Sequence, residues 1–141
     1  MRAALIIASL LLSAGCAHPI PDPDPNQAWV DLAPTQDTRL EALAVDSMRL
    51  EDDRYFQFEP GSRQLEMRYR FDVAGHDVGA GSAPLPRDCR LSLAYDRFSA
   101  GERYRLVAGR YGFRPWAKLY DEKNFLLARA EERGCGDVSG L

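Results

Sequence analysis

The stretch LEMRYRFDV (Leu65–Val73) decides the fold of this 141-residue chain. Apolar and charged side chains alternate along it without exception: Leu65, Met67, Tyr69, Phe71 and Val73 against Glu66, Arg68, Arg70 and Asp72. A period of two predicts a long antiparallel strand with one face in the core and the other in water. A shift of one residue would bury the four charged side chains, so the facing of this strand is fixed.

Shorter apolar stretches on the N-terminal side predict further strands. Ala28–Leu32 and Tyr55–Phe58 are rich in aromatic and β-branched residues and are bounded by turn residues. Thr35–Val45 is ambiguous, since Leu40, Leu43 and Ala44 suit one helical face while Leu40, Ala42 and Ala44 alternate as in a strand from Leu40. We favour a strand there, because Val45–Ser47 follows as a turn.

The C-terminal half continues the pattern. Strands are predicted at Cys89–Leu93, Tyr104–Ala108, Trp116–Tyr120 and Phe125–Ala130, with a long loop at Ala74–Arg87 and a hairpin loop at Gly109–Gly112. Seven or eight short strands, with turn residues about every ten positions, are typical of an all-β domain. We therefore expect a single antiparallel β-sandwich of the immunoglobulin-like or transthyretin-like kind.

The first 15 residues have the layout of an export signal. Arg2 is followed by the uncharged run Ala3–Leu12, and the small residues Ser13–Gly15 come just before Cys16. Ten apolar residues span only about 15 Å as a helix, half of a bilayer core, which argues against a permanent transmembrane helix. We expect residues 1–15 to be removed as a signal peptide.

Ala14–Cys16 resembles the lipobox of bacterial lipoproteins, although Ser13 stands where Leu is usual and Leu12 lies one step earlier. The resemblance implies a diacylglycerol thioether on Cys16, an acyl chain such as palmitate on the new N-terminus, and a membrane-anchored protein on the periplasmic face of the cell envelope. In that class, Ala17 rather than Asp after the cysteine favours the outer membrane. The chain is also similar to small Gram-negative envelope lipoproteins that carry no assigned mechanism. The alternative is an ordinary secretory signal with Cys16 as a bystander.

Residues 16–27 are predicted to be the lipidated cysteine and a tether, and residues 28–141 the β-sandwich domain. Prolines occupy every second position from Pro19 to Pro25, which excludes a helix and favours polyproline II geometry. The eleven residues Ala17–Gln27 then reach about 34 Å from the membrane surface. Removal of residues 1–15 leaves 126 residues, enough for one domain with a substantial core.

Cys89 and Cys135 are the two cysteines besides Cys16, and they lie 46 residues apart. An even pair in an oxidising compartment predicts a disulfide between Cys89 and Cys135. The alternative is a reactive thiol or a metal-binding pair. The chain has no Cys-x-x-Cys motif and only two histidines, so we expect neither a metal site nor a cofactor.

A second resemblance lies between residues 45 and 69. Val45-Asp46, the stretch Tyr55–Gly61 and the stretch Leu65–Tyr69 resemble PEGA-like β-domains, in which a Val-Asp-Gly turn, a strand, a Pro-Gly turn, a histidine and a strand follow one another. Ser47 stands where Gly is usual, and Arg63-Gln64 where the histidine usually lies. The resemblance implies a small surface-exposed β-sandwich used for binding or spacing, without catalysis.

Charge is distributed unevenly along the chain. Residues 16–77 carry 13 acidic and 6 basic side chains, while residues 87–118 carry 8 basic and 3 acidic ones. The whole chain has a net charge of −3, which argues against a nucleic-acid partner. The basic part predicts a possible binding surface made of Arg103, Arg105, Arg110, Tyr111, Arg114 and Trp116. Such a surface suits an anionic glycan, a lipid head group or an acidic envelope protein; the alternative is a solvated sheet face with the aromatic rings in the core.

If Arg90 shares the wet face of one sheet with Arg103 and Arg105, that face is basic. His76-Asp77 is the pair that most invites a catalytic interpretation, as a general base with its orienting acid. No serine near it lies in a nucleophile motif, so we expect no catalytic residues and no enzyme activity.

The leading hypothesis is a lipid-anchored, non-catalytic binding or assembly module of the periplasm. The alternatives are a secretion-apparatus accessory lipoprotein of transthyretin-like fold, a lysozyme inhibitor, and a cell-wall hydrolase that uses His76 with Asp77 or Asp72.

Overall fold

The computed structural model describes residues 18–136, so the predicted signal peptide and the predicted lipidation site Cys16 lie outside the described residues. The described residues form ten strands and one short helix: β1 (Ala28–Pro34), β2 (Arg39–Val45), β3 (Met48–Arg49), β4 (Tyr55–Phe58), β5 (Gly61–Val73), α1 (Gly75–Val78), β6 (Leu85–Phe98), β7 (Arg103–Tyr111), β8 (Arg114–Tyr120), β9 (Leu126–Arg129) and β10 (Glu131–Gly136).

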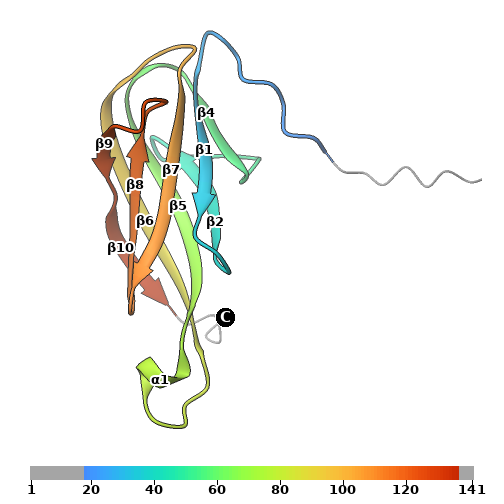
Figure 1. Cartoon of the computed structure of the whole chain (residues 1–141). Coiled ribbons are helices and arrows are strands. Elements are labelled where there is room, and N and C mark those ends of the chain that lie inside the picture. Colours follow the sequence, from blue (N-terminus) through green and yellow to red (C-terminus); the bar gives the residue numbers. More distant parts are fainter. Residues whose placement is uncertain (1–17, 137–141) are drawn as a thin grey trace, which may run out of the picture.

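The strands form two five-stranded sheets that face each other (Figure 1). Sheet A has the order β4-β1-β7-β8-β9, and sheet B has the order β10-β6-β5-β2-β3. Strands β1 and β7 pair in parallel, and the other neighbouring pairs in the two sheets are antiparallel. The prediction of an all-β sandwich is confirmed.

Strand β5 lies at the centre of sheet B, between β2 and β6. The predicted facing is confirmed, because Leu65, Met67, Tyr69 and Val73 are fully buried and Phe71 is nearly so. The opposing inner face of sheet A contributes Val30, Phe56, Leu106 and Leu119 to the same core cluster. Both sheets therefore bury alternate side chains against each other, as the period of two requires.

Some boundaries differ from the sequence-based expectation. The tail around Cys135 is an edge strand, β10, which pairs with β6 although it has no alternation of apolar residues. Its backbone hydrogen bonds and the disulfide hold it in the sheet, and neither leaves a periodic pattern in the sequence. With the two-residue strand β3, this brings the count within residues 18–136 to ten strands instead of seven or eight.

Two predicted loops are shorter than expected. β6 begins at Leu85, and the one-turn helix α1 stands at the tip of the β5–β6 hairpin, inside the loop predicted for residues 74–87. β7 continues through Gly109 to Tyr111, so the hairpin turns at Gly112, whose φ of 58° suits glycine. Gly109 therefore belongs to a strand and not to a turn.

The proline-rich segment leaves the sandwich at the end opposite to α1 (Figure 1). It is held to the domain at several points: Asp24 N–H donates to Gln57 Oε1 (2.9 Å), and Arg54 Nη1 donates to the carbonyl oxygen of His18 (2.6 Å). The carbonyl of Gln27 accepts from Gly101 N–H at 2.9 Å. The segment thus lies against β4 before it enters β1.

Candidate functional site

Strand β8 displays a regular pattern on the outer face of sheet A. Its inward residues Pro115, Ala117 and Leu119 are buried, so the alternate residues face outward in the order cation, ring, cation, ring: Arg114, Trp116, Lys118 and Tyr120. Strand β7 adds Arg105 opposite Tyr120 and Tyr111 opposite Arg114. We refer to these six residues as the aromatic–cationic band, which extends over about 20 Å of strand.

Gly109 determines how Trp116 lies in the band. Gly109 is the cross-strand partner of Trp116, and a Cβ atom at position 109 would come within 2.4 Å of Trp116 Cζ2. The indole therefore rests against the bare backbone of β7, in the space that a side chain would occupy. A ring placed on the sheet in this way forms part of a flat surface.

Neighbouring side chains surround this indole. The ring of Tyr111 lies 6.0 Å from it, tilted by 31°, and Tyr111 is 72% exposed. The Lys118 ammonium lies over the Trp116 ring, 4.9 Å from its centroid. At the other end of the band, the Arg105 guanidinium lies 5.5 Å from the centroid of the Tyr120 ring. Contacts between a cation and a ring face are favourable and hold these long side chains near the surface.

The cations of the band have few acidic partners. Lys118 and Arg105 make no ion pair within residues 18–136, and the Arg105 guanidinium donates to the neutral amide oxygen of Asn124 at 2.9 Å. Arg114 reaches Glu132 at 3.9 Å, but its side chain is 85% exposed. A long ion pair at such an exposed site contributes little, so the positive charge of the band is available to an anionic ligand.

Arg103 lies on the same face but has an internal partner. Its guanidinium donates two hydrogen bonds to Asp31, at 2.6 and 3.0 Å, and lies over the Trp29 ring, against which Tyr55 stacks. Burial raises the pKa of Asp31, but hydrogen bonds from Arg103 and Trp29 bring that pKa below its ordinary value. Trp29 is 2% exposed and Arg103 is paired with Asp31, so neither adds a free ring or a free cation to the band, and the surface predicted around Arg103 is reduced.

Two other arginines do not join the band. Arg110 follows the inward-facing series of β7, lies over the Phe71 ring at 5.8 Å, and donates to the carbonyl of Gly112. Arg90 lies on β6 in sheet B, so it does not share a sheet face with Arg103 and Arg105, which lie on β7 in sheet A. Strand alternation alone does not tell which of two sheets a strand joins.

Lys118 and Tyr120 belong to the band but were not among the residues predicted for it. The stretch RPWAKLY (Arg114–Tyr120) alternates cation, apolar, ring, apolar, cation, apolar, ring, and this pattern was available in the sequence. Reading outward strand positions together, instead of counting charges, would have found both residues.

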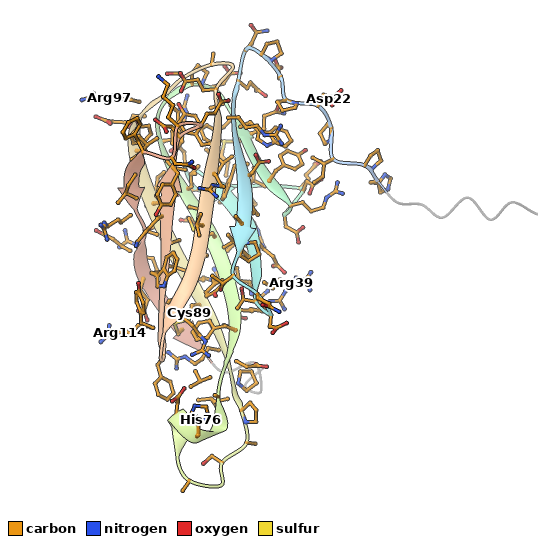
Figure 2. All side chains as sticks on the ribbon, in the orientation of Figure 1. Asp22, Arg39, His76, Cys89, Arg97 and Arg114 are labelled. Atoms are coloured by element: carbon orange, nitrogen blue, oxygen red, sulfur yellow. A yellow bond between two sulfur atoms is a disulfide. The ribbon has the colours of Figure 1, made fainter. Side chains whose placement is uncertain are left out.

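His76 and Asp77 lie in α1, at the tip of the β5–β6 hairpin (Figure 2). The His76 Nε2 and Asp77 Oδ1 atoms are 3.5 Å apart, and the two side chains are 83% and 45% exposed. Within residues 18–136 no serine, threonine or cysteine side chain is hydrogen-bonded to His76. The pair is therefore solvated and lacks the enclosed nucleophile that hydrolysis of the triad type requires.

The remaining sequence-based site is the cysteine pair. Cys89 on β6 and Cys135 on β10 are direct cross-strand partners and form a disulfide. The described part of the chain contains no group of three or more metal-ligating side chains. Over the same residues, no helix has the length and apolarity that a membrane span needs.

Comparisons with protein families, with curated proteins and with solved structures find no match for this chain.

Proposed function

We propose that the chain is a lipid-anchored, non-catalytic binding module of the bacterial cell envelope, and that its aromatic–cationic band binds an acidic glycan. The band is the observation that carries this proposal. It joins one exposed ring, Tyr111, and two half-buried rings, Trp116 and Tyr120, with cations on one sheet, whereas the described part of the chain offers no comparable catalytic arrangement.

The chemistry of the band favours a glycan among anionic ligands. A pyranose ring presents a flat face of C–H groups, which stacks on an aromatic face, and the exposed ring of Tyr111 supplies such a face, with the Trp116 indole beside it. The carboxylates of an acidic sugar suit the guanidinium of Arg114 and the ammonium of Lys118 on either side of the indole. A chain of sugars laid along β8 would meet rings and cations in turn.

The position of the band disfavours a lipid head group of the same membrane as the ligand. Arg114 lies in the half of the molecule away from Asp22, near the end that carries His76 (Figure 2). Under the proposal, the chain reaches the membrane through residues 16–27, which enter the domain at the opposite end. The Arg114 end of the band then faces away from that membrane and toward the glycans of the envelope.

The proposal of a lipid anchor is based on the sequence. Gly15-Cys16 after a short apolar run supports lipidation of Cys16 and attachment to the outer membrane, facing the periplasm. The disulfide between Cys89 and Cys135 supports an oxidising compartment such as the periplasm.

Co-sedimentation with polygalacturonate, an acidic glycan, and with neutral dextran tests the proposal. We expect the purified chain to bind polygalacturonate, and Trp116→Ala to weaken this binding roughly tenfold, through loss of the stacking surface. Phe125→Ala is the matched control, because Phe125 is an exposed ring outside the band, in the turn between β8 and β9. Equal binding of polygalacturonate by Trp116→Ala and Phe125→Ala would contradict the proposal. Equal binding of polygalacturonate and dextran by the unmodified chain would also contradict it.

A further inference from the structure

A second cluster of cations lies on the outer face of sheet B, away from the aromatic–cationic band. It surrounds a depression of about 410 Å³ lined by Arg68, Asp88, Arg90, Arg133, Gly134, Cys135 and Gly136. The lining comes from three neighbouring strands, β5, β6 and β10, of which β6 and β10 are joined by the disulfide. The depression is thus built on a covalently fixed part of the sheet.

Two of its arginines oppose each other directly. Arg68 on β5 and Arg90 on β6 are register partners, and like charges in this position repel. Arg68 turns its Nε and Nη2 groups to Asp88, at 2.8 Å for Nε to Oδ1, which leaves its Nη1 group without a hydrogen bond within residues 18–136. Arg90 is exposed and makes no ion pair or hydrogen bond in the same part of the chain.

The third arginine, Arg133, stands at a β-bulge and lines the edge of the depression. The register of β10 against β6 shifts between Glu132 and Gly134, so Arg133 is the extra residue. Its Nε donates to Ser92 Oγ at 2.6 Å, and Ser92 is only 4% exposed, while Nη2 lies 3.4 Å from Glu131. Bulges commonly redirect a side chain next to binding sites.

The lining therefore has three guanidinium groups and one carboxylate, Asp88, which Arg68 already neutralises. Guanidinium groups match the geometry of tetrahedral oxyanions, to which they donate paired hydrogen bonds. Three such groups on three strands around one depression suit a ligand with three outward oxygens better than a planar carboxylate. An anion between Arg68 and Arg90 would also remove their mutual repulsion.

We infer that this depression binds a phosphoryl group, held by Arg90, Arg133 and the free Nη1 group of Arg68. The inference does not rest on the aromatic–cationic band, since the two sites lie on different sheets. The phosphoryl group belongs either to a soluble phosphate compound or to a phospholipid head group, because both present the same oxygens.

Isothermal titration of the full chain with pyrophosphate, at constant ionic strength, tests the inference. We expect saturable binding that weakens roughly tenfold or more in Arg90→Gln with Arg133→Gln, because two charge-assisted contacts are lost. Arg97→Gln is the matched control: it removes the same charge from the far end of β6, where Arg97 is 82% exposed (Figure 2). Arg90→Gln alone serves if Arg133 proves necessary for folding, since the exposed Arg90 side chain has no partner to lose within the described residues.

A wild-type chain without saturable binding would overturn the inference, as would an equal loss in Arg90→Gln and Arg97→Gln. Asp88→Asn provides a test of opposite sign, because it removes the competing carboxylate and is expected to tighten pyrophosphate binding. Titration with a soluble short-chain phosphatidic acid shows whether the phosphoryl group comes from a phospholipid head group or from a soluble phosphate compound. Binding at least as tight as that of pyrophosphate indicates a lipid head group, and weaker binding indicates a soluble phosphate compound; both support the phosphoryl site.

Discussion

Gly109 is the residue on which the geometry of the proposed binding surface depends most. The absence of a Cβ atom allows the Trp116 indole to lie against β7, and its φ does not require glycine. We expect Gly109→Ala to displace the indole and weaken polygalacturonate binding severalfold, while the far-UV circular dichroism of the β-sheet stays unchanged.

The fluorescence of Trp116 is the direct readout of this displacement, measured in a Trp29→Phe background. Gly136→Ala is the matched control, since a Cβ atom there meets no atom within 4 Å. Unchanged glycan binding by Gly109→Ala, together with a shifted Trp116 emission, would show that the resting position of the indole does not matter for the ligand.

Asp88 is one of the residues that link the stability of sheet B to pH. Hydrogen bonds from Arg68 hold the pKa of the Asp88 carboxyl below its ordinary value, against the opposing effect of burial. A carboxyl with a lowered folded-state pKa stabilises the fold above its unfolded-state pKa, and this contribution is lost as the pH falls through the folded-state pKa.

We therefore expect Asp88→Asn to lower the free energy of unfolding by about 1 to 2 kcal/mol at neutral pH. The difference from the wild type should shrink as the pH falls through and below the ordinary aspartate range. Urea unfolding at a series of pH values measures it. A constant difference at every pH would show that the Asp88 charge contributes nothing.

At the scale of the elements, β10 is the strand that depends most on a single covalent bond. It lies at the edge of sheet B, has no apolar alternation and is joined to β6 by the disulfide. The bridge closes a loop with a sequence separation of 46, for which loop-closure entropy predicts a contribution of about 4 kcal/mol.

Cys89→Ala with Cys135→Ala is expected to expose the β10 amides to hydrogen exchange much faster than those of β5. Hydrogen–deuterium exchange by mass spectrometry measures this difference between the strands. Retained protection of β10 would show that its backbone hydrogen bonds suffice to hold the edge of the sheet.

The strands that alternate apolar and polar residues could be predicted from the sequence. Strands β4 and β5 are examples that were predicted correctly. Strand β10 was not, because an edge strand held by hydrogen bonds and one disulfide needs no apolar pattern. The loop predicted at Gly109–Gly112 failed for a related reason: glycine there makes room for an indole across the ladder, and nothing local distinguishes this from a turn.

The candidate site was predicted in part. Four of the six proposed residues lie in the aromatic–cationic band: Arg105, Tyr111, Arg114 and Trp116. Arg103 and Arg110 do not contribute, because Asp31, 72 residues away in sequence, neutralises Arg103, and the inward register of β7 turns Arg110 toward Phe71. Such long-range partners depend on sheet order, which single strands do not encode.

At the scale of the whole molecule, the proposed anchor and the two proposed sites require a defined orientation. The segment from His18 to Gln27 is held against β4, so it keeps a defined direction relative to the domain. We expect Cys16→Ser to abolish labelling of the protein by radioactive palmitate and to release it from the membrane fraction. Membrane retention of the unlabelled variant would contradict the proposed anchor.

The contact between Arg54 and His18 gives a second test at this scale. Arg54→Ala removes the donor to the His18 carbonyl and is expected to speed proteolytic cleavage within the proline-rich segment severalfold, without changing the melting temperature by more than a degree or two, because Arg54 is at the surface. Arg97→Ala is the control, since Arg97 makes no hydrogen bond or ion pair with residues 18–27. Equal cleavage of both variants would show that the segment is not held there.

Site-specific photo-crosslinking in intact cells tests glycan binding by the aromatic–cationic band. A photoreactive amino acid at Tyr111, in the band, is compared with one at Phe125, an exposed ring outside it. We expect the probe at position 111, and not the probe at position 125, to capture an acidic glycan. Capture of a stoichiometric envelope protein at position 111, with no glycan, would contradict glycan binding and indicate instead a component of an envelope assembly.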